Sequence, residues 1–332
     1  MDAIGKVATT GFLALALTAC ATHPLPEDYA GVSTYAIVRQ IRCETREAVK
    51  RSIFDFLADE RNATLNKVDD ASRKIGRHFR ENPKEAHKFS PASITGNARP
   101  IVDLIWKTGI AYNYSLEMTE TNNLGGDLNL LNALPTSNKM FGFKAGLNRQ
   151  RQNTRSFTVT DTFGELVGKV PETYCSEKFI AQDNIIYPIA GKVGIEPVIQ
   201  EFVLLSLFGN LSGNPTEQPW QPKGPPTLAE QLEFQTTLTA SATPKVTFAP
   251  LTAGMHLADA SFTADVTRKD VHKLTIGLYV PMKDVAALAD SRVGLFGSLI
   301  TAAGSKAELG AANAAAQLLT QKLLQQQILI QR

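Results

Sequence analysis

The feature of this sequence that most constrains its fold is an alternation of apolar and polar residues with a period of two. Successive side chains leave a β-strand on opposite faces, so such a segment predicts a strand with one buried and one wet face. The alternating segments are 110–118, 141–147, 157–163, 232–240, 246–248, 260–266 and 274–280. We therefore predict an α+β fold whose sheet is mostly antiparallel and has about six or more strands.

Turn-forming residues separate these segments. Gly125-Gly126-Asp127 and the run 134–138 supply turn chemistry between the first two predicted strands. The polar run 148–153 predicts a turn between the second and third. Five prolines crowd into 209–227 and predict a surface excursion. We expect one α+β domain over 33–300, with a split into two domains at 209–227 as the alternative.

Helical periodicity predicts three helices beside the sheet. From Ser33 to Leu57, apolar residues recur at steps of three and four, and Ser33 or Thr34 can cap the first turn. The buried stripe of this long helix comprises Val38, Ile41, Ala48, Val49, Ile53 and Phe56. The central stretch 195–208 is apolar on nearly every side, so we expect a buried helix there. The Ala-, Leu- and Gln-rich stretch 301–332 predicts a C-terminal helix.

The amino-terminal residues carry an export pattern. Lys6 precedes a short apolar run, 11–16, which is too short to span a bilayer as a permanent helix. The sequence Leu17-Thr18-Ala19-Cys20 follows, and it resembles the lipobox of bacterial lipoproteins. The resemblance implies that residues 1–19 are a signal peptide and that Cys20 becomes the lipidated first residue. The alternative is an ordinary secretory signal cleaved near Ala19 or Ala21.

Residues 20–32 are then expected to form a lipidated tether, because Pro24 and Pro26 favour an extended backbone. Ala21 and Thr22 follow the cysteine with no acidic residue. In lipoproteins this absence accompanies delivery to the outer membrane. The resemblance therefore implies a bacterial envelope protein that is held at the outer membrane by its lipid.

The remaining cysteines are expected to pair. Cys43 lies off the buried stripe of the first helix and shares a face with Arg39, Glu47 and Lys50. An unpaired thiol on such a face is open to oxidation, and an exported compartment favours disulfides. We predict a bond between Cys43 and Cys175, with two free, partly buried thiols as the alternative.

The charge and the carboxyl-terminal stretch bear on partners. The net charge is only +2, with 34 basic and 32 acidic residues, which gives no field to attract nucleic acid. The predicted helix over 306–330 is apolar on more than one face. It can pack on its own domain, or it can mediate self-association or contact with another protein.

Motifs for catalysis and cofactors are missing from the sequence. The five histidines have no metal-binding spacing, and the chain has no GxSxG elbow and no complete phosphate loop. His272 has Asp259, Asp265 and Asp270 close by in sequence, and an acid could orient it as a base, but a surface position at a hairpin is the favoured interpretation. We expect no cofactor, no metal and no catalytic residue.

These observations leave three hypotheses for function. The first and favoured one is a non-catalytic envelope lipoprotein that binds or scaffolds a partner. The second is a subunit of an oligomeric outer-membrane assembly, in which amphipathic hairpins of several copies complete a structure that one copy cannot. The third is a hydrolase whose site assembles from distant residues, with acidic groups and a histidine converging in one pocket.

Overall fold

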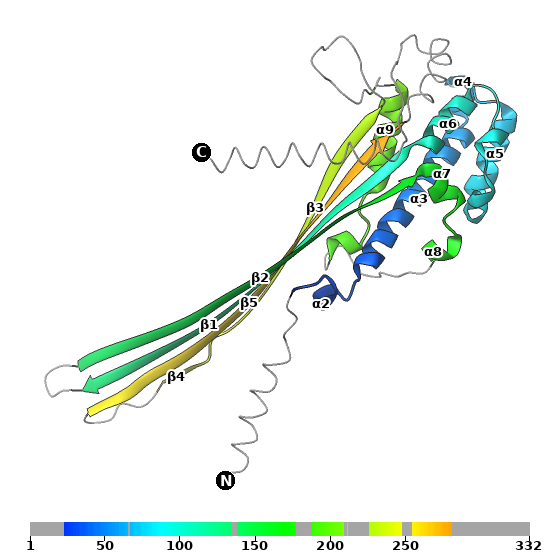
Figure 1. Ribbon diagram of the computed structural model, residues 1–332. Coiled ribbons are helices and arrows are strands. Elements are labelled where there is room, and N and C mark those ends of the chain that lie inside the picture. The colour runs from blue at the N-terminus through cyan, green and yellow to red at the C-terminus, as the bar shows by residue number, and fades with distance from the viewer. Residues whose placement is uncertain are drawn as a thin grey trace, which may run out of the picture. The chain divides into compact units, whose positions relative to one another are not determined.

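The computed structural model describes residues 23–65, 67–133, 138–176, 187–208, 211, 226–247 and 254–280. Within these ranges the chain is an α+β protein with an antiparallel sheet of five strands and several helices (Figure 1). The predicted signal peptide 1–19, the lipidation site Cys20, the C-terminal helix 301–332 and most of 209–227 lie outside the described residues.

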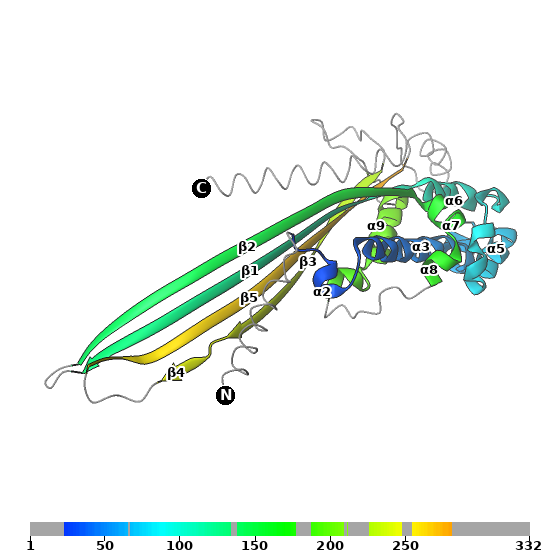
Figure 2. The same cartoon turned by 60° about the horizontal axis from the view of Figure 1, so that its bottom comes forward.

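The sheet is formed by long strands from both halves of the chain. Its strands are β1 (Gly109–Ala133), β2 (Asn138–Thr162), β3 (Thr227–Ala242), β4 (Lys245–Thr247) and β5 (Gly254–Tyr279). Figure 2 shows β2, β1, β5 and β3 side by side in this order, and β4 pairs with β5. The β4–β5 pairing is antiparallel and places Val246 opposite Ala260.

The prediction of about six or more strands is wrong for the described residues, because several predicted strands are continuous. The polar run 148–153, predicted as a turn, lies in the middle of β2, and Gly125-Gly126 lies inside β1. The polar residues of this run find partners without leaving the strand. Arg151 pairs with Glu120 of β1, and Asn153 donates a hydrogen bond to the carbonyl of Pro24.

The chain divides into two compact units. Unit 1 comprises Met1–Tyr29, Glu117–Thr154 and Thr237–Asp270. Unit 2 comprises Ala30–Leu116, Arg155–Thr236 and Val271–Arg332. The boundaries fall within the long strands and near the tether, and both sides of the proline-rich stretch 209–227 belong to unit 2.

The helices follow the tether and the strands. They are α2 (Glu27–Ala30), α3 (Thr34–Ala58), α4 (Arg61–Leu65), α5 (Asp70–Glu81), α6 (Ala98–Lys107), α7 (Phe163–Gly168), α8 (Glu172–Ser176) and α9 (Ile195–Phe208). Short 3-10 helices span Pro83–Lys88, Pro91–Ser93 and Pro188–Ala190. Among the described residues, no helix is both long enough and apolar enough to cross a membrane.

Helix α3 confirms the first predicted helix. Ser33 is its N-cap, and its hydroxyl accepts a hydrogen bond from the Ala36 amide at 3.2 Å, which satisfies one of the free donors of the first turn. Ile41 and Ile53 of the predicted stripe are fully buried. Ala48 and Val49 are fully buried as well, whereas Val38 and Phe56 are half-buried.

Helix α9 covers the predicted apolar stretch 195–208, and most of its surface is buried. Ile199 and Phe202 are fully buried, but Leu204 is 53% exposed, so the expectation of complete burial is wrong on one side of the helix. The exposed side also carries Gln200 and Glu201. A helix that packs against neighbours on one side only retains this exposed strip.

The core of unit 2 lies between the sheet and α3. Tyr112, Tyr114 and Leu116 of β1 are fully buried, as are Leu274 and Ile276 of β5. These residues alternate along their strands, so one face of the sheet supplies them all. The ring of Tyr114 stacks on Phe157 of β2 with centroids 4.8 Å apart. Burial of such large apolar side chains contributes about 1.5–3 kcal/mol each.

Helices α3 and α5 lie side by side (Figure 1), and they approach closely at a glycine of α5. A Cβ atom placed on Gly76 of α5 would lie 2.4 Å from the Cβ of Leu57 and 2.9 Å from the backbone nitrogen of Ala58. Real side chains do not approach so closely, and the second neighbour is backbone that cannot move freely. The close approach of the two helices therefore depends on this glycine.

Replacement of Gly76 by alanine is expected to destabilise the protein by about 1–3 kcal/mol, because overpacking forces the helices apart. Alanine stabilises a helix by about 1 kcal/mol relative to glycine, so helix propensity alone would make the variant more stable. A net loss of stability therefore reports the packing clash. Urea unfolding followed by far-UV circular dichroism measures the effect. Gly126→Ala is the control, since its Cβ would meet nothing within 4 Å. A Gly76→Ala protein as stable as wild type would contradict the packing account.

Candidate functional site

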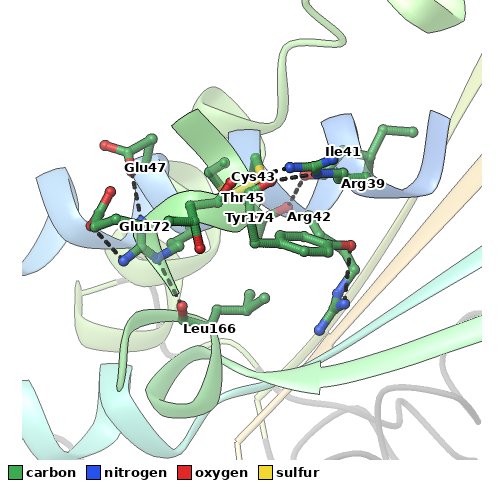
Figure 3. Close-up of a disulfide and its surroundings, with 12 residues drawn as sticks. Arg39, Ile41, Arg42, Cys43, Thr45, Glu47, Leu166, Glu172 and Tyr174 are labelled. Atoms are coloured by element: carbon green, nitrogen blue, oxygen red, sulfur yellow. Dashed lines mark hydrogen bonds and ion pairs between the residues drawn. A yellow bond between two sulfur atoms is a disulfide. The ribbon is translucent and has the colours of Figure 1, made fainter. Parts of the chain in front are cut away.

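A disulfide links the long helix of unit 2 to α8. Cys43 of α3 and Cys175 of α8 are bonded, with their Cα atoms 5.5 Å apart and a separation of 132 positions in the sequence (Figure 3). These are the two cysteines that the sequence analysis paired. The bond fixes the segment after α7 on the polar side of α3.

Arginine side chains of α3 reinforce this link. The Nε atom of Arg39 donates to the carbonyl oxygen of Tyr174, and its Nη2 atom donates to the carbonyl oxygen of Thr173 at 3.2 Å. The guanidinium carbon of Arg39 also lies 4.8 Å from the centre of the Tyr174 ring, within the range of a cation–π contact. Figure 3 shows Tyr174 next to Arg39 and Arg42.

A pocket of ≈ 360 Å³ opens beside this link in unit 2. It is lined by Arg42, Asp161, Glu165, Lys169, Val170, Pro171 and Tyr174. Arg42 and Asp161 form a two-pronged ion pair, with Nε to Oδ2 at 2.7 Å and Nη2 to Oδ1 at 2.6 Å. Lys169 and Glu165 form a second pair at 2.8 Å.

The charges of the pocket are thus already matched within the protein. The hydrogen bond to Asp161 raises the pKa of Arg42 above its ordinary value against the opposing effect of burial, so the guanidinium stays charged. The pocket lining contains no histidine, serine or cysteine. Acidic groups and a histidine, which the hydrolase hypothesis needs in one place, do not converge there.

The favoured interpretation of His272 as a surface residue is wrong. His272 is buried in β5, and its Nε2 atom shares a hydrogen bond with the hydroxyl of Tyr187. Asp270, one of the acids near it in sequence, pairs with Arg268 at 3.0 Å. Across the described ranges, no group of three or more His, Cys, Asp or Glu residues is arranged to hold a metal ion.

A buried arginine, Arg46, lies on α3 one helical turn after Arg42. The side chain of Arg46 is fully buried, donates from Nε to the carbonyl of Leu166 at 3.0 Å, and pairs with Glu172 of α8 at 2.6 Å. Lys50 also contacts Glu172, at 3.3 Å. Burial tends to raise the pKa of Glu172, but the hydrogen bond from Arg46 and the charges of Lys50 and Arg46 lower it below its ordinary value.

The tether of unit 1 is held by strand side chains. Asn153 of β2 donates from Nδ2 to the carbonyl oxygen of Pro24 at 3.0 Å, and Arg268 of β5 donates from Nη2 to the carbonyl oxygen of Leu25 at 2.6 Å. The amide of Leu25 donates to Asp28 at 2.7 Å. Pro24 and Leu25 of the predicted tether are therefore bound to the sheet, rather than forming only the extended segment that the prolines predict.

Unit 1 presents large apolar side chains on one side of its sheet. We call this set the apolar face, and its members are 44% to 62% exposed: Leu124, Leu128, Phe141, Phe143, Leu147, Val246, Phe262 and Val266. Cross-strand contacts establish that they share a side. Glu120 of β1 meets Arg151 of β2, so even-numbered residues of β1 lie on the same side as odd-numbered residues of β2.

The pairing with β5 and β4 completes this assignment. Asn129 of β1 donates to Asp259 of β5 at 2.7 Å, so residues of like parity in these two strands share a side. Val246 of β4 lies opposite Ala260, an even-numbered residue of β5. Among the described residues, Met140 is the one exposed large apolar side chain of unit 1 on the opposite side.

The opposite side of this sheet is polar. Lys144 lies 3.8 Å from Asp127, and Lys245 lies 4.0 Å from Asp259. Gln152 donates to Glu117 at 2.9 Å. Unit 1 therefore has one water-compatible side and one apolar side. The alternating segments 141–147 and 260–266 signalled this asymmetry in the sequence, but their apolar side was expected to be buried, whereas it is exposed.

Two comparisons with known proteins bear on the chain. A family model described as "Uncharacterised protein y4kA" matches residues 23–291. An uncharacterised protein y4kA from Sinorhizobium fredii (strain NBRC 101917 / NGR234) is 32% identical over 281 residues, which cover 80% of this chain and 82% of the relative. The range matched by the family model contains both disulfide cysteines and all five described strands.

Loss of the disulfide is expected to lower the stability of unit 2. A cross-link over 132 residues restricts the unfolded chain and contributes up to about 4–5 kcal/mol by chain entropy. The double variant Cys43→Ala/Cys175→Ala should unfold at lower urea concentration than wild type. Dithiothreitol should lower the wild-type midpoint and leave that of the double variant unchanged. Equal midpoints for both proteins without reductant would contradict this role.

Glu172→Gln is expected to cost about 1–3 kcal/mol at pH 7, because it leaves Arg46 with a neutral partner. The folded carboxyl has a lowered pKa, so it binds its proton less tightly than the unfolded one, whose ordinary value is 4.5. The contribution of Glu172 is therefore present above pH 4.5 and is lost as the pH falls through the lower folded pKa. The stabilities of wild type and Glu172→Gln should therefore converge at low pH. Urea unfolding of both proteins between pH 3 and pH 7 measures this. A stability difference that stays constant over that range would argue against it.

Proposed function

The chain belongs to the y4kA family, and from this premise we propose that it is a lipid-anchored, non-catalytic protein of the bacterial cell envelope that binds or scaffolds a partner. Cys20 carries the diacylglyceryl group and the amide-linked fatty acid, such as palmitate, of a lipoprotein. The anchor holds the protein at the outer membrane. Two or more acyl chains are needed for this, since one gives only reversible membrane binding.

The observation that supports this proposal is the fixed position of Pro24 and Leu25, which follow Cys20 in the sequence. The carbonyl groups of Pro24 and Leu25 are both bonded to strand side chains of unit 1. Pro24 is four positions after Cys20, and four residues of extended chain span at most about 14 Å. A lipid on Cys20 therefore holds unit 1 itself close to the membrane, rather than at the end of a long linker.

The disulfide supports an exported location. Disulfides persist in oxidising compartments such as the bacterial periplasm and are rare in reducing ones. The bond between Cys43 and Cys175 joins α3 to α8 and accompanies a set of ion pairs between the same elements. The partner surface on this proposal includes the predicted C-terminal helix 306–330, which would meet a protein partner or a second copy.

A second candidate is a subunit of an oligomeric outer-membrane assembly. The specific observation in its favour is the apolar face of unit 1, whose residues are exposed on one side of long antiparallel strands. An assembly of several copies would bring such strands together. This candidate shares the lipid anchor with the first and differs in what the apolar face contacts.

The anchor is tested by metabolic labelling of full-length protein in a Gram-negative host. Wild type is expected to incorporate labelled palmitate and to fractionate with the outer membrane, whereas Cys20→Ser should incorporate none. Cys43→Ser/Cys175→Ser is the matched control and should retain the label, because it removes two cysteines without touching Cys20. An unlabelled wild-type protein whose mass shows an unacylated amino terminus would refute the proposal.

A further inference from the structure

The apolar face of unit 1 is uniform over a defined length. Between Leu124 and Leu130, the residues of β1 on this side are leucines and Gly126. From Ala258 to Val266, the residues of β5 on this side are alanine, phenylalanine and valine. No charged side chain belongs to this side of the described strands within these limits. The helical residues that the structure describes in unit 1 are residues 27–29 of α2.

Charged residues bound the apolar face at both ends. On β2, the exposed residues Lys139 and Arg149 enclose Phe141, Phe143 and Leu147. Ten residues of strand span about 33 Å. At the tilt of about 45° that strands adopt in membranes, this length crosses about 23 Å. The apolar band of outer-membrane proteins is about 25 Å tall, so the dimensions agree.

We propose that this apolar face contacts the acyl chains of the bilayer to which Cys20 anchors the protein. The inference rests on the proposed function and names the partner of its exposed surface as lipid hydrocarbon. Phenylalanine, leucine, valine and alanine side chains are more stable in hydrocarbon than in water and require no hydrogen bond from it. The polar side, with its Lys144–Asp127 and Lys245–Asp259 contacts, faces water.

The tether lies at the charged border of the same side. Asn153 and Arg268, which hold Pro24 and Leu25, have the parity of the apolar face on their strands. Arg268 also pairs with Asp270 at 3.0 Å, and next to them Glu120 pairs with Arg151 at 2.8 Å. This ion-paired border suits the headgroup region. The acyl chains on Cys20 would then enter the membrane at the level where the apolar face begins.

Contact with lipid also requires hydrogen-bond partners for the backbone of the edge strands. Hydrocarbon offers no hydrogen-bonding groups to the backbone of an edge strand, and each unsatisfied group costs several kcal/mol. β2 is an edge of the sheet, and β3 and β4 lie at the other side of β5. Inside a membrane these edges pair with strands of neighbouring copies, so the inference includes an oligomer of this chain.

The test places fluorescent labels on both sides of two strands. Single cysteines replace Phe143 or Lys144 on β2 and Phe262 or Thr263 on β5 in the full chain, purified after processing and placed in vesicles of phosphatidylcholine and phosphatidylglycerol. An NBD probe labels only the introduced thiol, because Cys20 is acylated and Cys43 is bonded to Cys175. Brominated lipids quench probes in hydrocarbon, and iodide quenches probes in water. Far-UV circular dichroism verifies that each labelled protein is folded.

We expect the probes at 143 and 262 to lose most of their emission to brominated lipids and little to iodide. The probes at 144 and 263 should show the reverse. Iodide quenching at 143 and 262 would overturn the inference, because the face would be in water. Protection from both quenchers would overturn it too, because protein from a second copy or another partner would then cover the face. Quenching by brominated lipids on both sides of each strand would also overturn the inference, because the polar side would then lie in hydrocarbon as well.

Mass spectrometry of the same samples separates this inference from the anchor. An acylated Cys20 with iodide-accessible probes at 143 and 262 refutes lipid contact and leaves the lipoprotein proposal intact. An unacylated Cys20 would itself accept the probe, so labelling of the parent protein without an introduced cysteine reports failure of the anchor. In that event, the emission of the labelled parent protein is subtracted from that of each variant, and the quenching of the probes at 143, 144, 262 and 263 is then compared as before.

Discussion

The structure depends on the strict alternation of side chains across long antiparallel strands. In β1, even-numbered residues such as Tyr112 and Tyr114 are buried in the core of unit 2, and Leu124 and Leu128 of the same parity are exposed in unit 1. A shift of one residue in pairing would exchange the two sides, so the register is strongly specified in the buried part. The same register then determines which residues of unit 1 form the apolar face.

Unit 2 combines this sheet with covalent and ionic links along one helix. Cys43, Arg39 and Arg46 of α3 all contact the segment around α8, through the disulfide, backbone carbonyl groups and Glu172. A buried arginine is tolerated because its donors have partners, which offsets the cost of removing its charge from water. These links hold α8 and the pocket beside it, and they leave the pocket with charges that are already paired.

Much of the fold could be predicted from the sequence, because it depends on local periodicity. The stripe of Val49 and Ile53 and the cap at Ser33 gave α3, and the apolar run from Ile195 gave α9. The continuity of β2 through 148–153 could not be predicted, since it depends on Glu120 and the Pro24 carbonyl from distant segments. The burial of His272 likewise depends on Tyr187, which is 85 residues away. The pairing of Arg46 with Glu172 gave no local signal.

The central claim is that lipid hydrocarbon contacts one side of the sheet of unit 1. Electron paramagnetic resonance of spin labels moved one residue at a time along β5, from Leu257 to Val266, measures it most directly in phospholipid vesicles. The account predicts that access to dissolved oxygen peaks at even positions such as Ala260 and Phe262, while a water-soluble nickel chelate reaches odd positions such as Ser261. Equal access to the nickel chelate at even and odd positions would contradict it.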